Sequence, residues 1–239
     1  MFEHIKNWFI RRPDYEAQKP MYWESSSFVR ALPSHGDMVT LDESAYDAIK
    51  NIEGVELVGR QLANENKEMV AFLRYDNHDY KVYFYVDPWQ WQDLFQCQRQ
   101  FFRPGEMEQI QRVKSALCIH MDYHKGHVQE DFKLQLKLAV ALMPDMLALY
   151  DESAERLLNK VWVEQTAKSA VVPRLDSIYT VQAVADGDQV GLHTHGLIRC
   201  GVTELEVLGS DKAHYESHYG LLAAYASRLL EDMSADTDD

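Results

Sequence analysis

The chain has 239 residues, of which 46% are hydrophobic and 11% aromatic, enough apolar material for one large domain or two closely packed halves. It carries 24 basic and 38 acidic residues, a formal net charge of −14. Such a charge repels phosphate backbones and anionic lipids, which argues against nucleic acids and membrane surfaces as main partners. A basic protein partner is compatible with it, because opposite potentials speed encounter.

Cysteine usage and the absence of targeting patterns indicate the compartment. Cys97, Cys118 and Cys200 are widely spaced and form no CxxC pair, which favours a reducing cytoplasm over a disulfide framework. Residues 1–12 lack the pattern of a secretory signal peptide. No apolar stretch approaches the roughly 18 residues that span a bilayer. We therefore expect a soluble cytoplasmic protein.

The first part of the chain is predicted to form an N-terminal helix with a linker, residues 1–24, and a first α+β half, residues 25–103. Alternating and continuous apolar runs predict the strands, and helical spacing with N-cap residues predicts the helices. The strands of this half are expected at 27–32, 55–62, 69–75 and 80–86, and its helices at 41–51, with Asp42 as N-cap, and 87–102.

A second α+β half is predicted over residues 104–231, followed by a disordered acidic tail, residues 232–239. Its helices are expected at 106–114, 128–143, 151–167 and 211–231, and its strands at 115–123, 146–150, 177–185 and 189–195. Helices alternating with mostly hairpin-connected strands predict the α+β class. The expected architecture has two layers, with mostly antiparallel sheets and helices packed on one face. Two ferredoxin-like halves side by side are one arrangement that fits.

The densest polar chemistry lies in residues 192–208. In a strand, alternate residues share a face, so His193 and His195 are expected together, as are Glu204 and Glu206. If the two segments pair as a hairpin, these four side chains form a candidate site for zinc, manganese or iron. The alternative, which we favour, is a hydrogen-bonded face in which a Glu fixes each His or pairs with Arg199. We accordingly expect no cofactor.

A second polar face follows from the alternation of His120, Asp122 and His124, with His127 shortly after. The spacing suits a metal or an acid–base pair. Lys125 and Gly126 indicate that the strand ends here, so a solvated strand end is the preferred interpretation.

Aromatic residues gather between residues 89 and 102. Trp89, Trp91, Phe101 and Phe102 are candidate partner-binding residues, because aromatic side chains dominate interface hot spots. Core packing is the more frequent role of such residues, so the prediction applies to those of the four that are exposed.

The sequence His193-Thr-His-Gly-Leu-x-Arg199-Cys-Gly-x-x-Glu204-Leu-Glu206, after Tyr-Thr-Val-Gln-Ala-Val at 179–184, resembles a bacterial domain-of-unknown-function family with an LHTHGLxRCGxxELE signature. The likeness covers about residues 115–230 and implies no assigned activity. A looser similarity to suppressor-of-fused-type domains implies an immunity protein, which neutralises a cognate toxin.

These features together favour a non-enzymatic protein-binding protein of the bacterial cytoplasm whose partner is a basic protein, such as a toxin. The negative surface is expected to complement such a toxin, and clefts lined by Asp and Glu are expected to mimic a phosphate-rich substrate. A second copy of the chain is another candidate partner. The alternative function is a metal-dependent hydrolase that uses the His193, His195, Glu204 and Glu206 face.

Overall fold

The computed structural model describes residues 25–34, 41–63 and 68–235, so the predictions for residues 1–24 lie outside the described chain. Seven strands form a large sheet of spatial order β2-β3-β4-β5-β1-β6-β7, in which every pairing is antiparallel. These strands are β1 (Ser26–Pro33), β2 (Val55–Ala63), β3 (Glu68–Tyr75), β4 (His78–Pro88), β5 (Ser115–Asp122), β6 (Met146–Asp151) and β7 (Arg156–Asn159).

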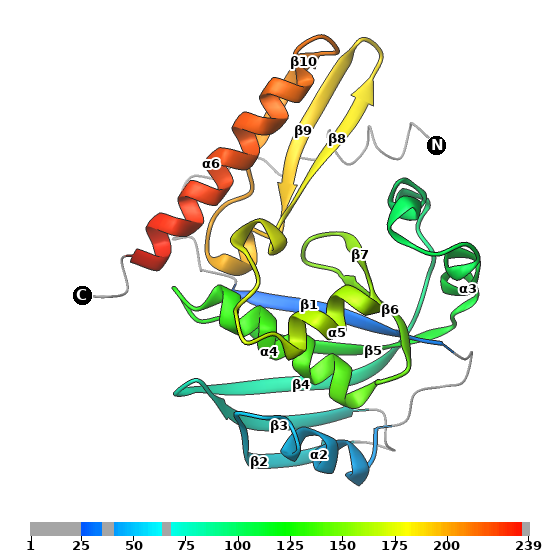
Figure 1. The fold of residues 1–239 in the computed structure, drawn as a ribbon, viewed down its shortest axis with the longest axis vertical. Helices are drawn as coiled ribbons and strands as arrows, with labels where there is room; N and C mark the ends of the chain where they lie inside the picture. The colour runs from blue at the N-terminus through cyan, green and yellow to red at the C-terminus, as the bar shows by residue number, and fades with distance from the viewer. Residues whose placement is uncertain (1–24, 35–40, 64–67, 236–239) are drawn as a thin grey trace.

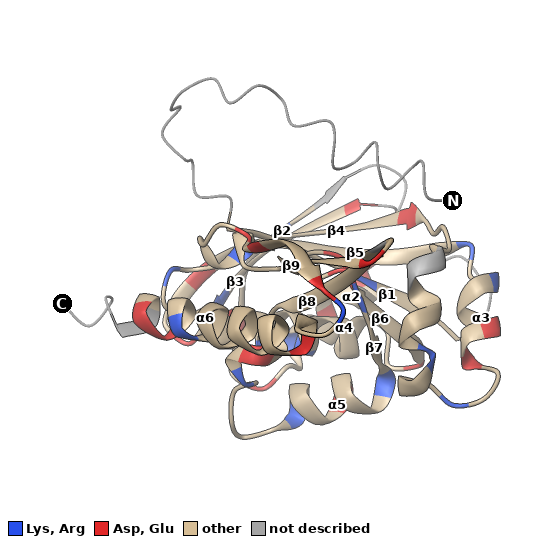
Figure 2. Ribbon diagram, turned by 90° about the horizontal axis from the view of Figure 1, so that it is seen from above, with Lys and Arg blue, Asp and Glu red and all other residues tan. Residues whose placement is uncertain are grey.

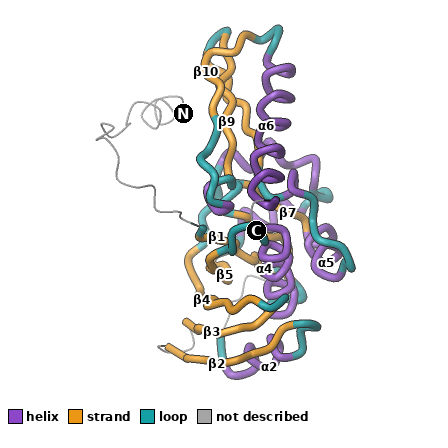
Figure 3. Tube along the Cα trace, turned by 90° about the vertical axis from the view of Figure 1, so that its left-hand side faces the viewer, coloured by secondary structure: helices purple, strands orange, loops and turns teal. Residues whose placement is uncertain are grey.

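Helices α2 (Glu43–Lys50), α4 (Val128–Leu142) and α5 (Lys160–Lys168) lie on one side of the large sheet (Figure 3). The start of α2 confirms its predicted N-cap, because the Asp42 side chain accepts a hydrogen bond from the Ser44 amide at 2.8 Å. Helix α4 buries most of its circumference, and its buried residues include the polar Asp131, Lys133 and Gln135 as well as apolar side chains. This burial explains why its sequence shows no clean amphipathic stripe.

A second apolar cluster lies beside β6 and β7, under η1 (Asp93–Phe101), a 3₁₀ helix, and α3 (Glu106–Arg112). The prediction of a helix over residues 87–102 is wrong for the residues before Asp93. Residues Asp87 and Pro88 belong to β4, where they lie opposite Ala116 and Ser115 of β5. Pairing with β5 therefore outweighs the local helix-start signal, and the helical turn begins only at Asp93.

The remaining elements form a separate arm, which projects from the large sheet (Figure 1). We call it the C-terminal arm. It consists of a three-stranded antiparallel sheet and helix α6, with a small apolar cluster of its own between them. The hairpin predicted over residues 186–188 is confirmed. The elements are β8 (Thr180–Asp186), β9 (Gln189–His195), β10 (Glu206–Asp211) and α6 (Tyr215–Ala235), with short 3₁₀ turns η2 (Leu175–Ser177) and η3 (Ile198–Cys200) at the base.

The predicted α+β class, with antiparallel sheets and helices on one face, is confirmed. Two ferredoxin-like halves are not formed, because β4 pairs with β5 and β1 lies between β5 and β6, so strands from both sides of residue 103 share one sheet. The helix expected over 151–167 begins only at Lys160, after β7, and α6 continues to Ala235, into the predicted tail. Among the described helices, none has the length and apolar character required to cross a bilayer.

Candidate functional site

The signature stretch forms a tight loop between β9 and β10, and Glu204 fixes its shape. The Glu204 carboxylate accepts hydrogen bonds from the backbone amides of Gly196 (2.8 Å) and Ile198 (3.1 Å) and from the hydroxyl of Thr194 (2.6 Å). Three donors on one carboxylate hold the backbone of the loop in a single conformation. This loop carries the Arg199 side chain into the protein interior, where it is fully buried.

Gly196 is required for this loop to approach the rest of the protein. Its φ of 105° lies in a region that L residues rarely adopt. A Cβ atom at this position would lie 2.8 Å from the carbonyl oxygen of Ile178 and 3.2 Å from the Ala154 Cβ. The glycine therefore permits close contact between the loop and two separate segments of the chain.

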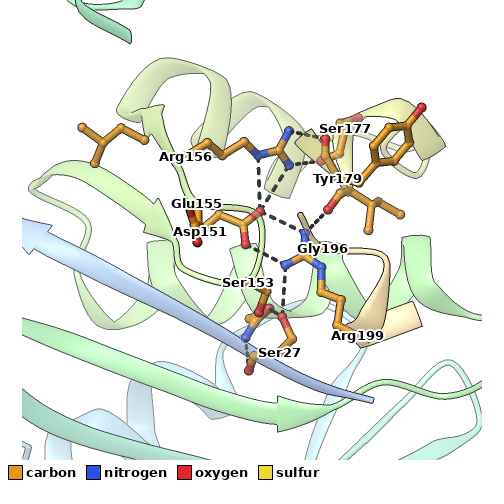
Figure 4. A network of polar contacts seen from close by, with 12 residues as sticks. Ser27, Asp151, Ser153, Glu155, Arg156, Ser177, Tyr179, Gly196 and Arg199 are labelled. Carbon is orange, nitrogen blue, oxygen red and sulfur yellow. Dashed lines mark hydrogen bonds and ion pairs between the residues drawn. The ribbon is translucent and has the colours of Figure 1, made fainter. Parts of the chain in front are cut away.

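Arg199 binds the carboxylate of Asp151, at the end of β6, with two parallel hydrogen bonds of 2.7 and 2.9 Å (Figure 4). Its guanidinium also donates to the hydroxyl of Ser27 at 3.2 Å and to the carbonyl of Ile178. Arg156 donates to the same Asp151 carboxylate at 3.2 and 3.3 Å. We call Asp151, Arg156 and Arg199 the buried clamp.

The buried clamp places two guanidinium groups around one carboxylate. Burial has the largest single effect on the pKa of Arg199 and lowers it, but the charges of Asp151 and Tyr123 and the hydrogen bond with Asp151 together keep that pKa above its ordinary value. Burial and the nearby Arg199 lower the pKa of Arg156, although a guanidinium remains protonated in proteins. The ring of Phe132 lies 4.9 Å from the Arg199 guanidinium carbon and 5.9 Å from that of Arg156, which partly compensates the second positive charge.

Three of the four candidate metal ligands come together and the fourth does not. His193 lies opposite Glu206 in the β9–β10 pair, and the rings of His193 and His195 are 4.6 Å apart. Glu204 is instead engaged by the loop amides. Nδ1 of His195 lies 3.5 Å from a carboxylate oxygen of Glu155. Burial, together with the neighbouring His195, lowers the pKa of His193 to about 4, so this imidazole is neutral near pH 7.

Within the described ranges, no three or more His, Cys, Asp or Glu side chains are arranged to hold a metal ion. The metal site therefore remains a prediction from sequence spacing.

The second polar face separates into two environments. His120 stacks on Phe28 of the neighbouring strand, with ring centroids 4.1 Å apart. His124 lies beyond the end of β5, where its Nδ1 is 3.7 Å from a carboxylate oxygen of the fully buried Asp131. The neighbouring Asp131 carboxylate raises the pKa of His124. The end of β5 is thus partly built into the core.

The four candidate partner-binding aromatics divide between core and surface. Trp89 is buried, stacks on Phe95 and donates its indole N–H to the carbonyl of Ile110 at 3.2 Å, so it is a core residue. Trp91 and Phe102 are partly buried against the same cluster. Phe101 is 60% exposed.

Phe101 and Phe102 line an open groove of about 530 Å³, together with Val161 of α5 and charged residues around its rim. We call this surface the aromatic groove. Of the predicted partner-binding residues, these two are therefore placed on a concave surface.

Two family models divide the chain. A model described as the N-terminal part of a protein of unknown function (DUF4026) matches residues 27–173, and the model of its C-terminal part matches residues 178–239. The chain belongs to the DUF4026 family. No curated protein and no solved structure matches it. The border between the two DUF4026 regions falls at η2, and the buried clamp crosses it, since Asp151 and Arg156 lie in the first region and Arg199 in the second.

Sequence reasoning identified the signature stretch but missed the buried clamp. The sequence predicts a nearby Glu as the partner of Arg199, whereas the partner in the structure, Asp151, lies 48 positions earlier in the chain. One signal points to Asp151: an acidic residue that directly follows the apolar run 146–150 is placed at the end of a buried strand. A carboxylate in such a position requires a cationic partner.

We expect Gly196→Ala to lower the free energy of unfolding by about 3 kcal/mol, because the methyl group meets backbone atoms at an unfavourable φ. The control is Gly187→Ala, in the β8–β9 turn, where φ is also positive but no atom lies within 4 Å of the added carbon. Gly187→Ala should lower the free energy of unfolding by only about 1 kcal/mol. Urea unfolding of both variants measures the difference, and equal losses would show that the close contact at Gly196 is unimportant.

We expect Asp151→Asn to lower the free energy of unfolding by about 3–5 kcal/mol, because it leaves the buried guanidinium group of Arg199 and the partly buried one of Arg156 without a counter-charge. Asp79→Asn is the matched control, since it removes the same charge from an exposed ion pair with Arg74. Its unfolding midpoint should equal that of the unsubstituted protein. If Asp151→Asn lowers the free energy of unfolding as little as Asp79→Asn does, the proposed role of the buried clamp in stability is contradicted.

Proposed function

We propose that this DUF4026 protein is a non-enzymatic binding protein that recognises a protein partner through the aromatic groove. The observation that carries the proposal is the exposure of two large apolar side chains on the groove walls, Phe101 at 60% and Val161 at 47%. Exposed apolar side chains beside a concave surface are typical anchors of protein interfaces.

Contacts on both sides hold the groove wall in place. Gln98 of η1 accepts a hydrogen bond from the backbone amide of Leu157 at 2.6 Å and donates to the carbonyl of Glu155 at 3.3 Å. Asn159 donates to the carbonyl of Phe101 at 3.4 Å. A wall fixed in this way loses little conformational entropy when a partner binds, which favours affinity.

The charges around the groove differ from the acidic cleft that the sequence predicts. The groove lining includes two basic residues, Arg103 and Lys160, and two acidic ones, Glu106 and Asp145. Acidic and basic residues are also interspersed over the part of the chain that the structure describes (Figure 2). The partner segment that fits is an apolar side chain flanked by charges of both signs. The net charge of −14 then acts at long range, where it attracts a basic partner.

The buried cysteines of the described chain are consistent with a binding protein that has no cysteine nucleophile. Burial raises the pKa of the Cys118 and Cys200 thiols to about 12, so neither is a ready nucleophile at neutral pH. Neutralisation of a bacterial toxin is one specific form of the proposed activity, suggested by the loose similarity to immunity domains. A cytoplasmic location fits the wide spacing of the three cysteines and the lack of any CxxC pair among them.

The test replaces Phe101 by a photoreactive benzoylphenylalanine in the full-length protein, within the cell to which the protein is native. The control carries the same group at Tyr225, which is 55% exposed on α6 and outside the groove. We expect the Phe101 position alone to cross-link to one polypeptide, which mass spectrometry identifies. A cross-linked second copy of the chain would reveal self-association instead of a separate partner.

The polypeptide identified in this way is then purified for binding measurements. Phe101→Ser should weaken its binding at least tenfold, and Tyr225→Ser less than twofold, because a hot-spot aromatic contributes more than about 1 kcal/mol. Equal cross-linking at both positions, or unchanged binding by Phe101→Ser, overturns the proposed function.

A further inference from the structure

The two sheets of the described chain end in four edge strands, and three of these edges are protected against the addition of a further strand. At β7, the Gln98 side chain of η1 covers the edge and accepts a hydrogen bond from the backbone amide of Leu157 at 2.6 Å. The edge strands β2 and β10 are each interrupted by a shift of pairing register, and both contain charged residues. Bulges, charges and covering segments are the usual means by which proteins prevent pairing at an edge.

The fourth edge strand, β8, lacks these protections. It pairs with β9 in an unbroken register over all of Thr180–Asp186. Residues 180–185 include no charged side chain and no proline. The C-terminal arm projects from the large sheet (Figure 1), and β9 is the only strand beside β8 in the described chain. A regular, uncharged edge of this kind is a template for another strand.

The β8–β9 turn determines which backbone groups of β8 point toward the open edge. The hairpin turns over two residues, and the pair Asp186–Gln189 closes it. The closing pair of such a hairpin is hydrogen-bonded, and hydrogen-bonded pairs then alternate along the ladder. The amides and carbonyls of Val181, Ala183 and Ala185 therefore point away from β9.

The opposite strand of the hairpin shows the same alternation. Thr194 lies opposite Val181 in the ladder. It donates its amide to the carbonyl of Leu205 at 2.9 Å, on the side away from β8. Because the members of a non-hydrogen-bonded pair point in opposite directions, the backbone groups of Val181 point outward from β8. Within the described segments, no backbone hydrogen bond joins this outer side of β8 to a turn or loop.

The outward groups of β8 are complementary to those of a second β8. When a second copy runs antiparallel with its Ala183 opposite Ala183, Val181 of each copy lies opposite Ala185 of the other. All three outward-pointing residues then form pairs that exchange two hydrogen bonds each. Ala183 and Ala185 are exposed and small, so the adjacent strand meets no bulky side chain there.

The side chains of β8 also suit this arrangement. Val181 packs against the apolar cluster of the C-terminal arm that includes Leu222 of α6, so alternate residues from Val181 onward lie on the α6 face. The antiparallel register about Ala183 places these residues on the same face in both copies. The absence of charge on residues 180–185 allows two chains of net charge −14 to approach at this edge.

We propose that two copies of the chain associate through β8, antiparallel about Ala183, so that their three-stranded sheets form one continuous sheet. Both α6 helices then lie on the same face of that sheet. The contact consists mainly of backbone hydrogen bonds between small side chains, so the dimer is weak and forms with rising protein concentration.

The experiment is sedimentation equilibrium of the full-length protein from about 5 to about 500 µM, at about 0.15 M salt to screen the repulsion between acidic copies. Ala183→Pro removes the outward amide at the two-fold axis and leaves the β8–β9 ladder intact, since proline is tolerated on an edge strand where the N–H faces outward. Ala183→Ser is the matched control, because it keeps the amide at the same exposed position.

We expect a monomer–dimer equilibrium whose dissociation constant rises at least tenfold in Ala183→Pro and less than twofold in Ala183→Ser. A monomer at every concentration, or equal association of the proline variant, overturns the proposal.

Hydrogen exchange of the unsubstituted protein gives a second readout that does not depend on how the proline variant folds. The amides of Val181, Ala183 and Ala185 should exchange more slowly as protein concentration rises, because the second copy accepts hydrogen bonds from them. Exchange of these three amides that is independent of concentration contradicts pairing through β8. Both readouts are independent of the aromatic groove, because β8 contributes no residue to it.

Discussion

Asp151 is the carboxylate shared by the buried guanidinium group of Arg199 and the partly buried one of Arg156, and the attachment of the C-terminal arm depends on it. The transfer of these charges from water to the interior is costly, and only close bidentate geometry with additional hydrogen bonds compensates it. Arg199 meets this requirement with bonds of 2.7 and 2.9 Å to Asp151 and further bonds to Ser27 and Ile178. Because such geometry tolerates little displacement, the clamp specifies where the arm docks more than it adds net stability.

Apolar contacts between the base of the C-terminal arm and the large sheet add to this attachment. The main core includes Ile178, Leu197 and Leu230 of the second DUF4026 region together with strands of the large sheet. The apolar cluster within the arm itself is small and centres on Val190, Leu192 and Leu222. Because the core of the arm is small and its base packs into the main core, we expect the two DUF4026 regions to unfold as one cooperative unit.

Local patterns in the sequence predicted most strands, the Asp42 N-cap and the shared face of His193 and His195, because each depends on neighbouring residues. Interactions between distant segments were not predictable in this way. Periodicity contains no information on which strand lies beside β1, so the order of the large sheet was missed. Glu204 was expected in a strand, but the amides of Gly196 and Ile198 offer it a better set of donors. Phe101 and Trp89 have similar sequence surroundings, and only tertiary packing separates the exposed side chain from the buried one.

Native-state hydrogen exchange on the full-length protein tests most directly whether the clamp makes the two regions one cooperative unit. The best protected amides of β6 report on the opening of the large sheet, and those of β9 report on the opening of the C-terminal arm. If the regions open together, both sets exchange with the same free energy of opening and the same dependence on urea concentration. Exchange of the β9 amides through a separate opening, with a lower free energy and a smaller urea dependence, would contradict the account.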